Sequence, residues 1–477
     1  MTTNQSATIP AFSILPEPEL LFHCDRFQDK SLHPLKGLVE FGPYSRSQLN
    51  SVIDPVRVAI VAPKDQANRL SNLVKELESS AKPIERKNYL VDFPGFSRVF
   101  GVRVIQSDVV VELSGDIDKA ISKAQKPHLE LLSKLVQALS VLRSRRSEFD
   151  IAMLLLPSKW QACFTGGDDD DFDLHDFLKA TTASWGIPIQ IIRENSALTY
   201  PCRCSVLWRL SIAMYCKAGG IPWKLADSDQ ETAFIGLSYA LKKPGSDNRF
   251  VTCCSQVFDS DGAGLEFLAY ETTQAVIEQR NPFLTRSEMR KVMSRSLMLY
   301  QKRHGGRAPK KLIIHKNNLF KKDEVEGVFD IFEAAESIDL LHVQPHAAWR
   351  GVKLEKPRRE GQKAAPAMYP CERGTMLQLS GTETLLWVQG NAPTITGRDF
   401  FKEGKGIPSA ILLTRYAGHG SFNDSCKSAL ALTKMDWNSD SLYSKEPVTI
   451  KYAGVLADIA KRMDTVGSAP YEFRFFM

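Results

Sequence analysis

Short apolar runs alternate with longer amphipathic stretches in the first third of the chain, and this alternation constrains the fold more than any other feature of the sequence. Two stretches, 66–79 and 128–145, carry apolar residues at helical spacing. The runs around them predict strands at 56–63 (VRVAIVAP), 97–105 (SRVFGVRVI) and 149–157 (FDIAMLLLP). Strands that alternate with helices are typical of an open, mostly parallel sheet. The sequence therefore predicts an α/β fold.

The same alternation continues through the rest of the 477 residues. Residues 221–230 follow two consecutive glycines that end a predicted helix, and we expect them to be a linker. We therefore place one domain at 51–230 and a second at 231–477, after an irregular, proline-interrupted N-terminal segment at 1–50. Further predicted helices lie at 174–185, 204–218, 286–303, 323–337 and 452–463, and further strands at 187–194, 232–241, 310–316 and 338–344.

Positive charge is concentrated in the second half of the chain. Residues 1–230 hold 27 basic and 27 acidic side chains, so the formal net charge of +6 arises from 231–477. The stretch 289–322 has eleven basic residues and no acid. Such a run is solvated, paired with acids elsewhere in the fold, or placed against a polyanion such as a phosphate backbone. The acidic run from Asp168 to Asp171 predicts a solvated turn, with a metal site as the alternative.

No segment of the sequence predicts export or membrane insertion. The N-terminus has no basic stretch before its short apolar run. The most apolar stretches are far shorter than the roughly 20 residues that a bilayer span needs. We therefore expect a cytoplasmic protein.

Four residues of the first half are candidate ligands for a terminal phosphate. His175 and Lys179 are four residues apart on a predicted helix and therefore project from one face. Gln190 lies in the following predicted strand, and Lys217 lies in the last turn of the next helix. Converging donors of this kind hold a phosphate through charge-assisted hydrogen bonds. A lysine in a last turn is also what the helix dipole favours, so the spacing alone leaves both roles open.

The order of these residues resembles a known family. H-x-x-x-K, then Gln, then a lysine just before two glycines (YCKAGGIPWKL) is similar to the MID-domain pocket of Argonaute proteins, which holds the 5′ phosphate of a guide strand. The opening segments PELLF and GLVEFGPY resemble those of prokaryotic Argonautes. Four later segments resemble successive core segments of a PIWI domain, namely AFIGLSYA, KKLIIHKNN, LALTKMDWN and PVTIKYAGVLADIAKRM.

This resemblance implies a Rossmann-like MID domain at 51–230 followed by an RNase H-like PIWI domain at 231–477. Too little chain precedes residue 51 for the N-terminal and PAZ domains of long Argonautes. The resemblance therefore implies a short prokaryotic Argonaute. It also implies that His175, Lys179, Gln190 and Lys217 bind the guide 5′ phosphate.

Cleavage by an RNase H-like domain needs clustered carboxylates, because two divalent ions must be held about 4 Å apart. Where the family places its aspartates and its final metal ligand, this chain has Ser238, Asn317 and Gly454, and we place no glutamate that would complete the set. These residues cannot replace charged metal ligands, so we predict a catalytically inactive PIWI domain. The alternative is an active guide-directed nuclease, in which our register is shifted and carboxylates such as Asp247 or Asp323 serve.

A guide-holding protein that does not cut must report target binding through another protein. In short Argonautes this is an effector with an APAZ region and a sirtuin-like or TIR domain that consumes NAD, and neither domain is seen in this sequence. The resemblance implies a guide RNA-loaded sensor of single-stranded DNA from invading plasmids or phages. Its separate APAZ-containing partner, with a sirtuin-like domain favoured over TIR, would deplete NAD in antiviral defence by abortive infection. A nucleic-acid-binding module without a guide is a further alternative.

The C-terminal segment YEFRFFM also bears on the predicted pocket. In related proteins the terminal carboxylate enters the MID pocket and helps a divalent ion hold the guide phosphate. The resemblance implies that Met477 supplies this carboxylate, with Mg²⁺ as the ion. An apolar tail that simply packs against the protein is the other interpretation.

Overall fold

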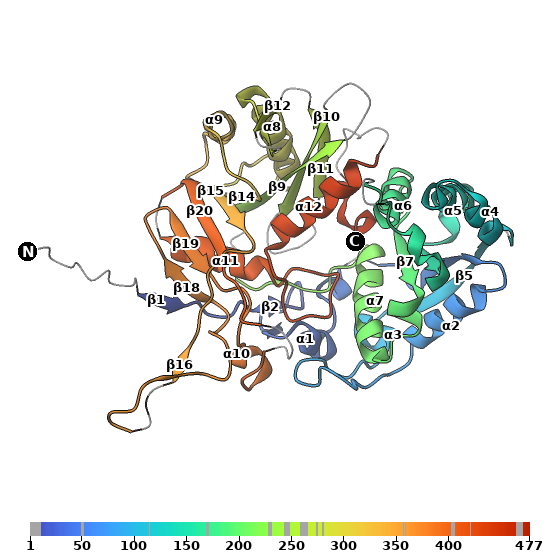
Figure 1. Ribbon diagram of the computed structural model, residues 1–477, viewed down its shortest axis with the longest axis horizontal. Helices are drawn as coiled ribbons and strands as arrows, with labels where there is room; N and C mark the ends of the chain where they lie inside the picture. Colours follow the sequence, from blue (N-terminus) through green and yellow to red (C-terminus); the bar gives the residue numbers. More distant parts are fainter. Residues whose placement is uncertain are drawn as a thin grey trace, which may run out of the picture.

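The computed structural model describes residues 11–48, 52–113, 115–167, 171–227, 231–242, 249–257, 266–272, 275–278, 281–355, 357, 359–401, 406–419, 421–463 and 471–477. Two sheets dominate these residues, and they lie side by side in Figure 1. Within the described ranges, no helix is both long enough and apolar enough to cross a membrane.

The first sheet has four parallel strands in the order β5-β4-β6-β7. Its two central strands are apolar except for Arg57 near the start of β4, as expected where both faces of a parallel sheet are covered. One face packs against α2 and α7, and the other against α5 and α6. The strands are β4 (Val56–Pro63), β5 (Val104–Leu113), β6 (Ile151–Leu156) and β7 (Ile189–Arg193), and the helices are α2 (Ala67–Leu77), α5 (Pro127–Ser144), α6 (Leu174–Ser184) and α7 (Arg203–Lys217).

The expected strand at 97–105 is wrong except at its last two residues, Val104 and Ile105, which begin β5. Residues Phe96–Phe100 form helix α3, which lies between two glycines with positive φ, Gly95 and Gly101. Glycine adopts this backbone conformation without steric cost and therefore ends the helix at Gly101. The buried residues of α3 are spaced for a helix face, and a short apolar run does not distinguish this from a strand.

The second sheet has ten strands in the order β1-β18-β19-β20-β15-β14-β9-β10-β11-β21. β14 is parallel to both β9 and β15, and the other pairs are antiparallel. Its strands are β1 (Phe12–Ile14), β9 (Thr232–Lys242), β10 (Arg249–Val257), β11 (Glu266–Thr272), β14 (Lys311–Lys316), β15 (Ser337–Gln344), β18 (Thr375–Gln378), β19 (Glu383–Leu386), β20 (Ile411–Ala417) and β21 (Tyr471–Glu472). Together with the first sheet, it confirms the α/β prediction.

Helices cover both faces of this large sheet. α8 (Arg286–Arg303) and α9 (Lys322–Phe329) share a core with one face of β9 and β14. α12 (Val448–Ala460) approaches the other face, where Thr449 meets Gly236 and His315. α11 (Phe422–Leu432) packs under β15, β19 and β20.

The N-terminal segment connects the two sheets. β1 joins the edge of the large sheet, and β2 (Leu20–Leu21) pairs with β3 (Lys30–Ser31) and β8 (Lys224–Leu225). β8 lies within the stretch that we expected to be a linker. The helix α1 (Pro34–Phe41) follows β3 and packs into the core of the first sheet.

Replacing Gly236 by alanine should destabilise the protein by about 1–3 kcal/mol or more, because overpacking a closed contact forces the backbone to move. A Cβ atom at Gly236 would lie 1.9 Å from the main-chain oxygen of Thr449 on α12. Gly454, on the same helix, is the matched control, because nothing lies within 4 Å of the Cβ that it would gain. Gly454→Ala should instead stabilise the helix by about 0.5–1 kcal/mol. Chemical denaturation of both variants measures the difference, and equal effects would contradict the close approach of α12.

Candidate anion-binding site

Two buried lysines meet between α6 and α7. Lys179 and Lys217 are only 2% and 1% exposed. The charge of Lys217 acts on Lys179, and Cys216 acts on Lys217. Lys179 lies on the buried face of α6, and Lys217 is the last residue of α7, before the turn at Gly219. A lysine is rarely buried without a counter-charge, so this arrangement needs a chemical reason.

Oxygen atoms from two distant segments surround Lys179. Its Nζ donates a hydrogen bond to the main-chain oxygen of Ile189 at 2.8 Å and another to the main-chain oxygen of Met477. The final 3-10 turn, Phe473–Phe475, contacts both α6 and α7. Figure 1 accordingly shows the C-terminus beside these two helices. The Nζ of Lys217 has no hydrogen-bond partner among the described residues.

Burial weakens the charge of both lysines. Burial lowers the pKa of Lys179 well below its ordinary value, and the nearby charge of Lys217 lowers it further. Burial also lowers the pKa of Lys217 to about 7, although Cys216 opposes part of this effect. An anion placed between the two ammonium groups would restore their charged forms. The pocket is therefore suited to bind a phosphate or carboxylate.

Gln190 and His175 differ in how they relate to this pocket. Gln190 follows Ile189 in β7, and its Oε1 is buried without a hydrogen-bond partner among the described residues. His175 is more exposed, and its Nδ1 lies 3.1 Å from Oδ1 of Asp176. The structure thus brings Lys179, Lys217 and Met477 together, with Gln190 next in sequence to a residue of the pocket. It does not show the His175 ring bonded to any of them.

Two cations that we did not single out from the sequence, Lys461 and Arg462, directly follow α12 and lie near the start of α6. The Nζ of Lys461 lies 3.2 Å from Asp171, and Arg462 lies 3.1 Å from the same carboxylate and over the ring of Phe177. Their only sequence signal is a basic pair at the end of a predicted helix, which the helix dipole also favours. The expected aspartate turn is described only at Asp171, and 168–170 lie outside the described residues.

The three positions expected to be degenerate lie on β9, after β14 and on α12. Ser238 is 2% exposed and accepts a hydrogen bond from Nδ2 of Asn317 at 3.2 Å. Gly454 faces open space. A buried carboxylate lies close in sequence to Asn317, but both oxygens of this Glu324 accept hydrogen bonds from Lys316 at 2.7 Å. Both Glu324 oxygens are thus engaged in the ion pair with Lys316.

Groups of three side chains that could hold a metal ion occur at two places within the described ranges. One is His23, Cys24 and Asp25, and the other is Asp173, His175 and Asp176. Neither group includes the three degenerate positions. Of the alternative carboxylates, Asp323 is exposed at the start of α9, and Asp247 lies outside the described residues.

The basic run at 289–322 is largely paired with acids that come from elsewhere in the chain. With partners in the described part of the chain, at least six of its members form ion pairs within 4 Å. These pairs are Arg290–Asp330, Lys291–Glu288, Lys310–Glu231, Lys316–Glu324, Lys321–Glu278 and Lys322–Glu326. Ion pairs with acidic side chains thus account for more than half of the basic residues in this run, and a polyanion is not needed to explain it.

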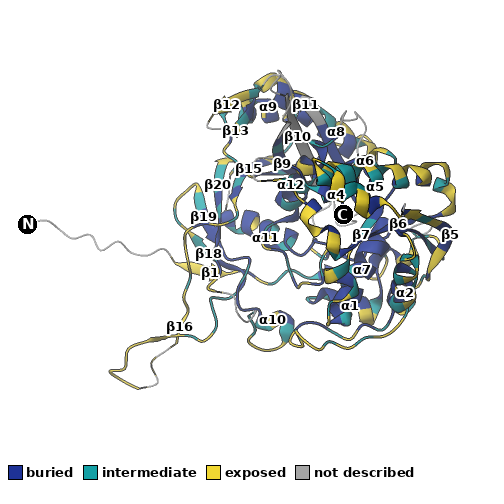
Figure 2. Ribbon diagram, turned by 45° about the vertical axis from the view of Figure 1, so that its right-hand side comes forward, coloured by how far each residue is buried: buried dark blue, intermediate teal, exposed yellow. Residues whose placement is uncertain are grey.

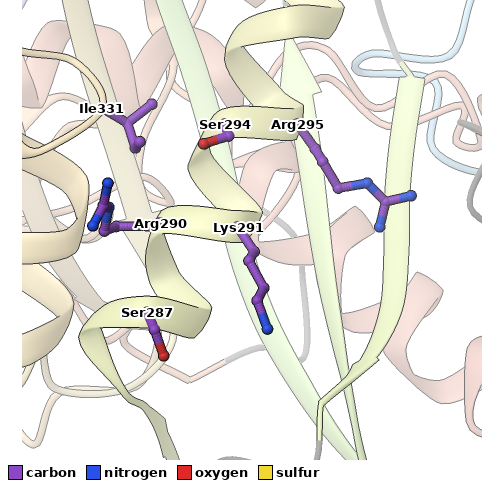
Figure 3. Close-up of a pocket in the computed structure, with 6 residues that line it drawn as sticks. All are labelled: Ser287, Arg290, Lys291, Ser294, Arg295 and Ile331. Atoms are coloured by element: carbon purple, nitrogen blue, oxygen red, sulfur yellow. The ribbon is translucent and has the colours of Figure 1, made fainter.

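One face of α8 nevertheless keeps a basic depression with a volume of about 540 Å³. Figure 3 shows Ser287, then Arg290 with Lys291, then Ser294 with Arg295 on successive turns of the helix. Ile331 lines the opposite side. The depression is wide and solvent-exposed, and its side chains belong to one helix face, which is ordinary for a solvated basic helix.

A larger cavity of about 670 Å³ is lined almost entirely by residues of the second half of the chain. Its wall includes Tyr89 from the first half of the chain and Phe400 from the second, with ring centroids 5.4 Å apart. Lys445 and Lys451 line it together with Glu446. Aromatic rings beside cations suit the stacked bases and phosphates of a nucleic-acid strand.

By sequence, no protein-family model and no curated protein matches this chain. Solved structures do match its fold. Clostridium butyricum Argonaute bound to a guide DNA and a 19-mer target DNA has a TM-score of 0.64 at 15% identity, covering 100% of this chain and 56% of that one. Aquifex aeolicus Argonaute has a TM-score of 0.62 at 16% identity, covering 98% and 55%. Drosophila Piwi has a TM-score of 0.57 at 13% identity, covering 98% and 55%.

The chain spans just over half the length of these solved proteins. The likeness covers both sheets, because nearly the whole of this chain is aligned in each case. At this level of identity the comparison speaks for the fold. This protein therefore has an Argonaute-like fold.

Proposed function

We propose that this protein is a guide RNA-loaded sensor that binds single-stranded DNA and does not cleave it. The observation that carries the proposal is the pair of buried lysines beside Met477, one of which has no hydrogen-bond partner among the described residues. A guide 5′ phosphate is the anion that an Argonaute-like fold would place there. In this proposal residues 51–230 are a Rossmann-like MID domain, and residues 231–477 are an RNase H-like PIWI domain.

The guide would continue from this pocket along the cavity of about 670 Å³ described above. Lys445 and Lys451 would contact its backbone, and the half-buried ring of Phe400 offers an aromatic surface to its bases. Backbone contacts would provide most of the affinity, and base pairing would read the target sequence. Protein contacts of this kind do not depend on the guide sequence.

A magnesium ion fits the proposed pocket only together with the guide. Mg²⁺ requires oxygen ligands, and the pocket offers the carboxylate of Met477. Phosphate oxygens and water would complete its coordination. The two lysines already provide positive charge, so the ion would add to their binding of the phosphate.

The proposal includes no nuclease activity in this chain. A serine, an amide and a glycine at 238, 317 and 454 cannot hold two metal ions. Signalling would therefore fall to a separate APAZ-containing chain with a sirtuin-like or TIR domain, which would deplete NAD when invading DNA is bound. The support for this last step is that a guide-loaded protein without a cleavage site needs another output.

Incubation of the purified, guide-loaded chain with complementary DNA and Mg²⁺ or Mn²⁺ should leave the target intact. The purified chain without a guide should bind a 5′-phosphorylated guide about tenfold or more tightly than its 5′-hydroxyl form, because one charge-assisted hydrogen bond is worth about 1.5–3 kcal/mol. Target cleavage at one position midway along the guide would establish the nuclease alternative. Equal affinity for the two guides would favour a nucleic-acid-binding module without a guide.

A further inference from the structure

The large sheet ends at an exposed edge strand. β1 is the first strand in the sheet order, and the described residues place no strand on its outer side. Phe12 and Ile14 are 68% and 49% exposed, and Figure 2 shows β1 as exposed. An exposed apolar edge strand is a template for pairing with another strand, and proteins usually protect such an edge.

The backbone groups of Phe12 and Ile14 point away from the sheet. β1 is antiparallel to β18, with Phe12 opposite Leu377 and Ile14 opposite Thr375. The N–H of Leu15 donates to the main-chain oxygen of Gly374 at 2.9 Å. Because N–H and C=O groups alternate in direction along an antiparallel strand, those of Phe12 and Ile14 face outward. An added strand would pair with these groups.

The two faces of this end of the sheet are covered differently. On one face, Leu15 belongs to a closed core that includes residues of α11. On the other face, Leu377, Leu385 and Trp387 belong to a small cluster of which no member lies in a helix. Phe12 is on this second face, because directly opposed side chains of paired strands share a face. The exposed apolar residues of β1 therefore border a small cluster that has no helical member and in which Leu385 and Trp387 are themselves buried.

A projecting hairpin extends this surface. β16 (Leu354–Glu355) and β17 (Ala365–Pro366) pair at the base of a long excursion, which stands out from the molecule in Figures 1 and 2. Near its start, a Cβ on Gly351 would lie 3.2 Å from the Trp387 ring. The excursion therefore begins on the face that carries this cluster. Its exposed apolar side chains are Trp349, Val352, Leu354 and Met368.

The same excursion carries a strong excess of positive charge. In the sequence, residues 350–363 contain six basic and two acidic side chains, of which Lys356 and Arg358 lie outside the described residues. One of the basic residues, Lys353, is paired with Glu372 at 3.0 Å. A partner with acidic residues would be attracted to this surface, whereas a second copy of the chain, paired edge to edge, would bring two basic hairpins together.

We propose that β1 and the described residues of the excursion 349–368 form a docking surface for an extended segment of a different protein chain. The segment adds a strand to β1, covers Phe12 and Ile14 with apolar side chains, and places acidic residues against the hairpin. This inference rests on the proposed function only for the source of the segment, which we expect to be the effector chain. The strand pairing itself follows from the exposed edge and its charge.

Site-specific photocrosslinking tests the surface in the full-length protein. Benzoylphenylalanine replaces Phe12 in the protein expressed in its native host, and mass spectrometry identifies the crosslinked peptide. We expect a peptide from another protein, with alternating apolar residues and acidic flanks. The same group at Val141, which is exposed on α5, is the position control and should not capture that peptide. Crosslinks from Phe12 to nucleic acid, to residues 1–10 or to another copy of this chain would overturn the proposal, as would no crosslink.

The backbone requirement is tested by Ile14→Pro against Ile14→Val. Proline removes an outward N–H and is tolerated on an edge strand, so the fold should persist while the Phe12 crosslink falls about tenfold. Valine keeps the N–H and should leave the yield unchanged. If Ile14→Pro fails to fold, Ile14→Asp against Ile14→Lys replaces it, and aspartate should weaken capture more because the partner is acidic. Equal yields within either pair would overturn strand addition.

A guide-binding control separates this inference from the proposed function. Ile14→Pro should keep the preference for a 5′-phosphorylated guide, because Ile14 lies at the edge of the ten-stranded sheet, whereas Lys179 and Lys217 lie on helices that cover the four-stranded sheet. If the wild-type protein showed no preference for the 5′-phosphorylated guide, but the protein with benzoylphenylalanine at Phe12 still captured the partner peptide, the guide pocket would be rejected and the docking surface would stand. The reverse result would reject the docking surface alone.

Discussion

Replacing Glu17 by glutamine should destabilise the protein by about 3–5 kcal/mol, the usual cost of removing one partner from a buried ion pair. The Glu17 carboxylate lies between two buried cations. The Nε of Arg373 is 2.9 Å away, and the Nζ of Lys434 is 3.0 Å away. Burial alone would raise the pKa of Glu17, but the two cations outweigh it and hold the pKa below its usual value. The variant leaves both cations without their counter-charge.

This triad anchors the N-terminal segment to the large sheet. Lys434 also donates to the main-chain oxygens of Pro18 and Leu32, at 2.7 and 2.6 Å. Arg373 donates to Thr433 at 2.9 Å and to the main-chain oxygen of Val388. Loss of the Glu17 charge should therefore loosen residues near β1 and β2 before the rest of the protein. Hydrogen exchange of these segments provides a local measurement.

Glu19→Gln is the matched control for this experiment. Glu19 lies two residues further on, but its side chain is 45% exposed and its partner Lys30 is 3.7 Å away. Exposed pairs of this kind contribute about 0–1 kcal/mol. Urea denaturation should therefore separate the two variants clearly. Similar losses from both would contradict a special role for the buried triad.

Lys217→Met should weaken binding of a 5′-phosphorylated guide by about tenfold or more, because it removes a charge-assisted contact. The same change should stabilise the protein by about 1–3 kcal/mol, because Lys217 is buried and its Nζ has no hydrogen-bond partner among the described residues. These opposite signs distinguish a binding residue from a structural one. Affinity for the 5′-hydroxyl guide is the internal control, and it should not change.

The pH dependence of both quantities follows from the pKa of Lys217. Unfolded, Lys217 has its ordinary pKa of 10.5, whereas burial lowers the folded value to about 7. Between these values the unfolded state binds more protons, so stability should rise with pH. A bound phosphate holds Lys217 charged, so the 5′-phosphate preference should fall above pH 7, by up to about tenfold per pH unit. Fluorescence titrations at several pH values measure this slope, which Lys217→Met should reduce. An unchanged slope would assign the proton uptake to another group, such as Lys179.

Most secondary-structure elements were predictable because each depends on residues close together in the sequence. The predicted helix at 286–303 has the same bounds as α8, and the predicted strand at 56–63 those of β4. The failure at 97–105 came from a run too short for its periodicity to separate a helix from a strand. We missed β8 within the expected linker, because its pairing with β2 depends on a segment about 200 residues away.

The sequence alone determined the α/β alternation and the face of α6 that carries Lys179, since both follow from local periodicity. Only the tertiary structure decided that Lys179 meets Lys217 and Met477, that acids from other segments pair with most of the basic run, and that β1 lies at an open edge. These contacts join residues far apart in the chain; Lys179 and Met477 are separated by 298 positions. Their formation depends on how apolar faces across the chain are buried together, which no local pattern encodes.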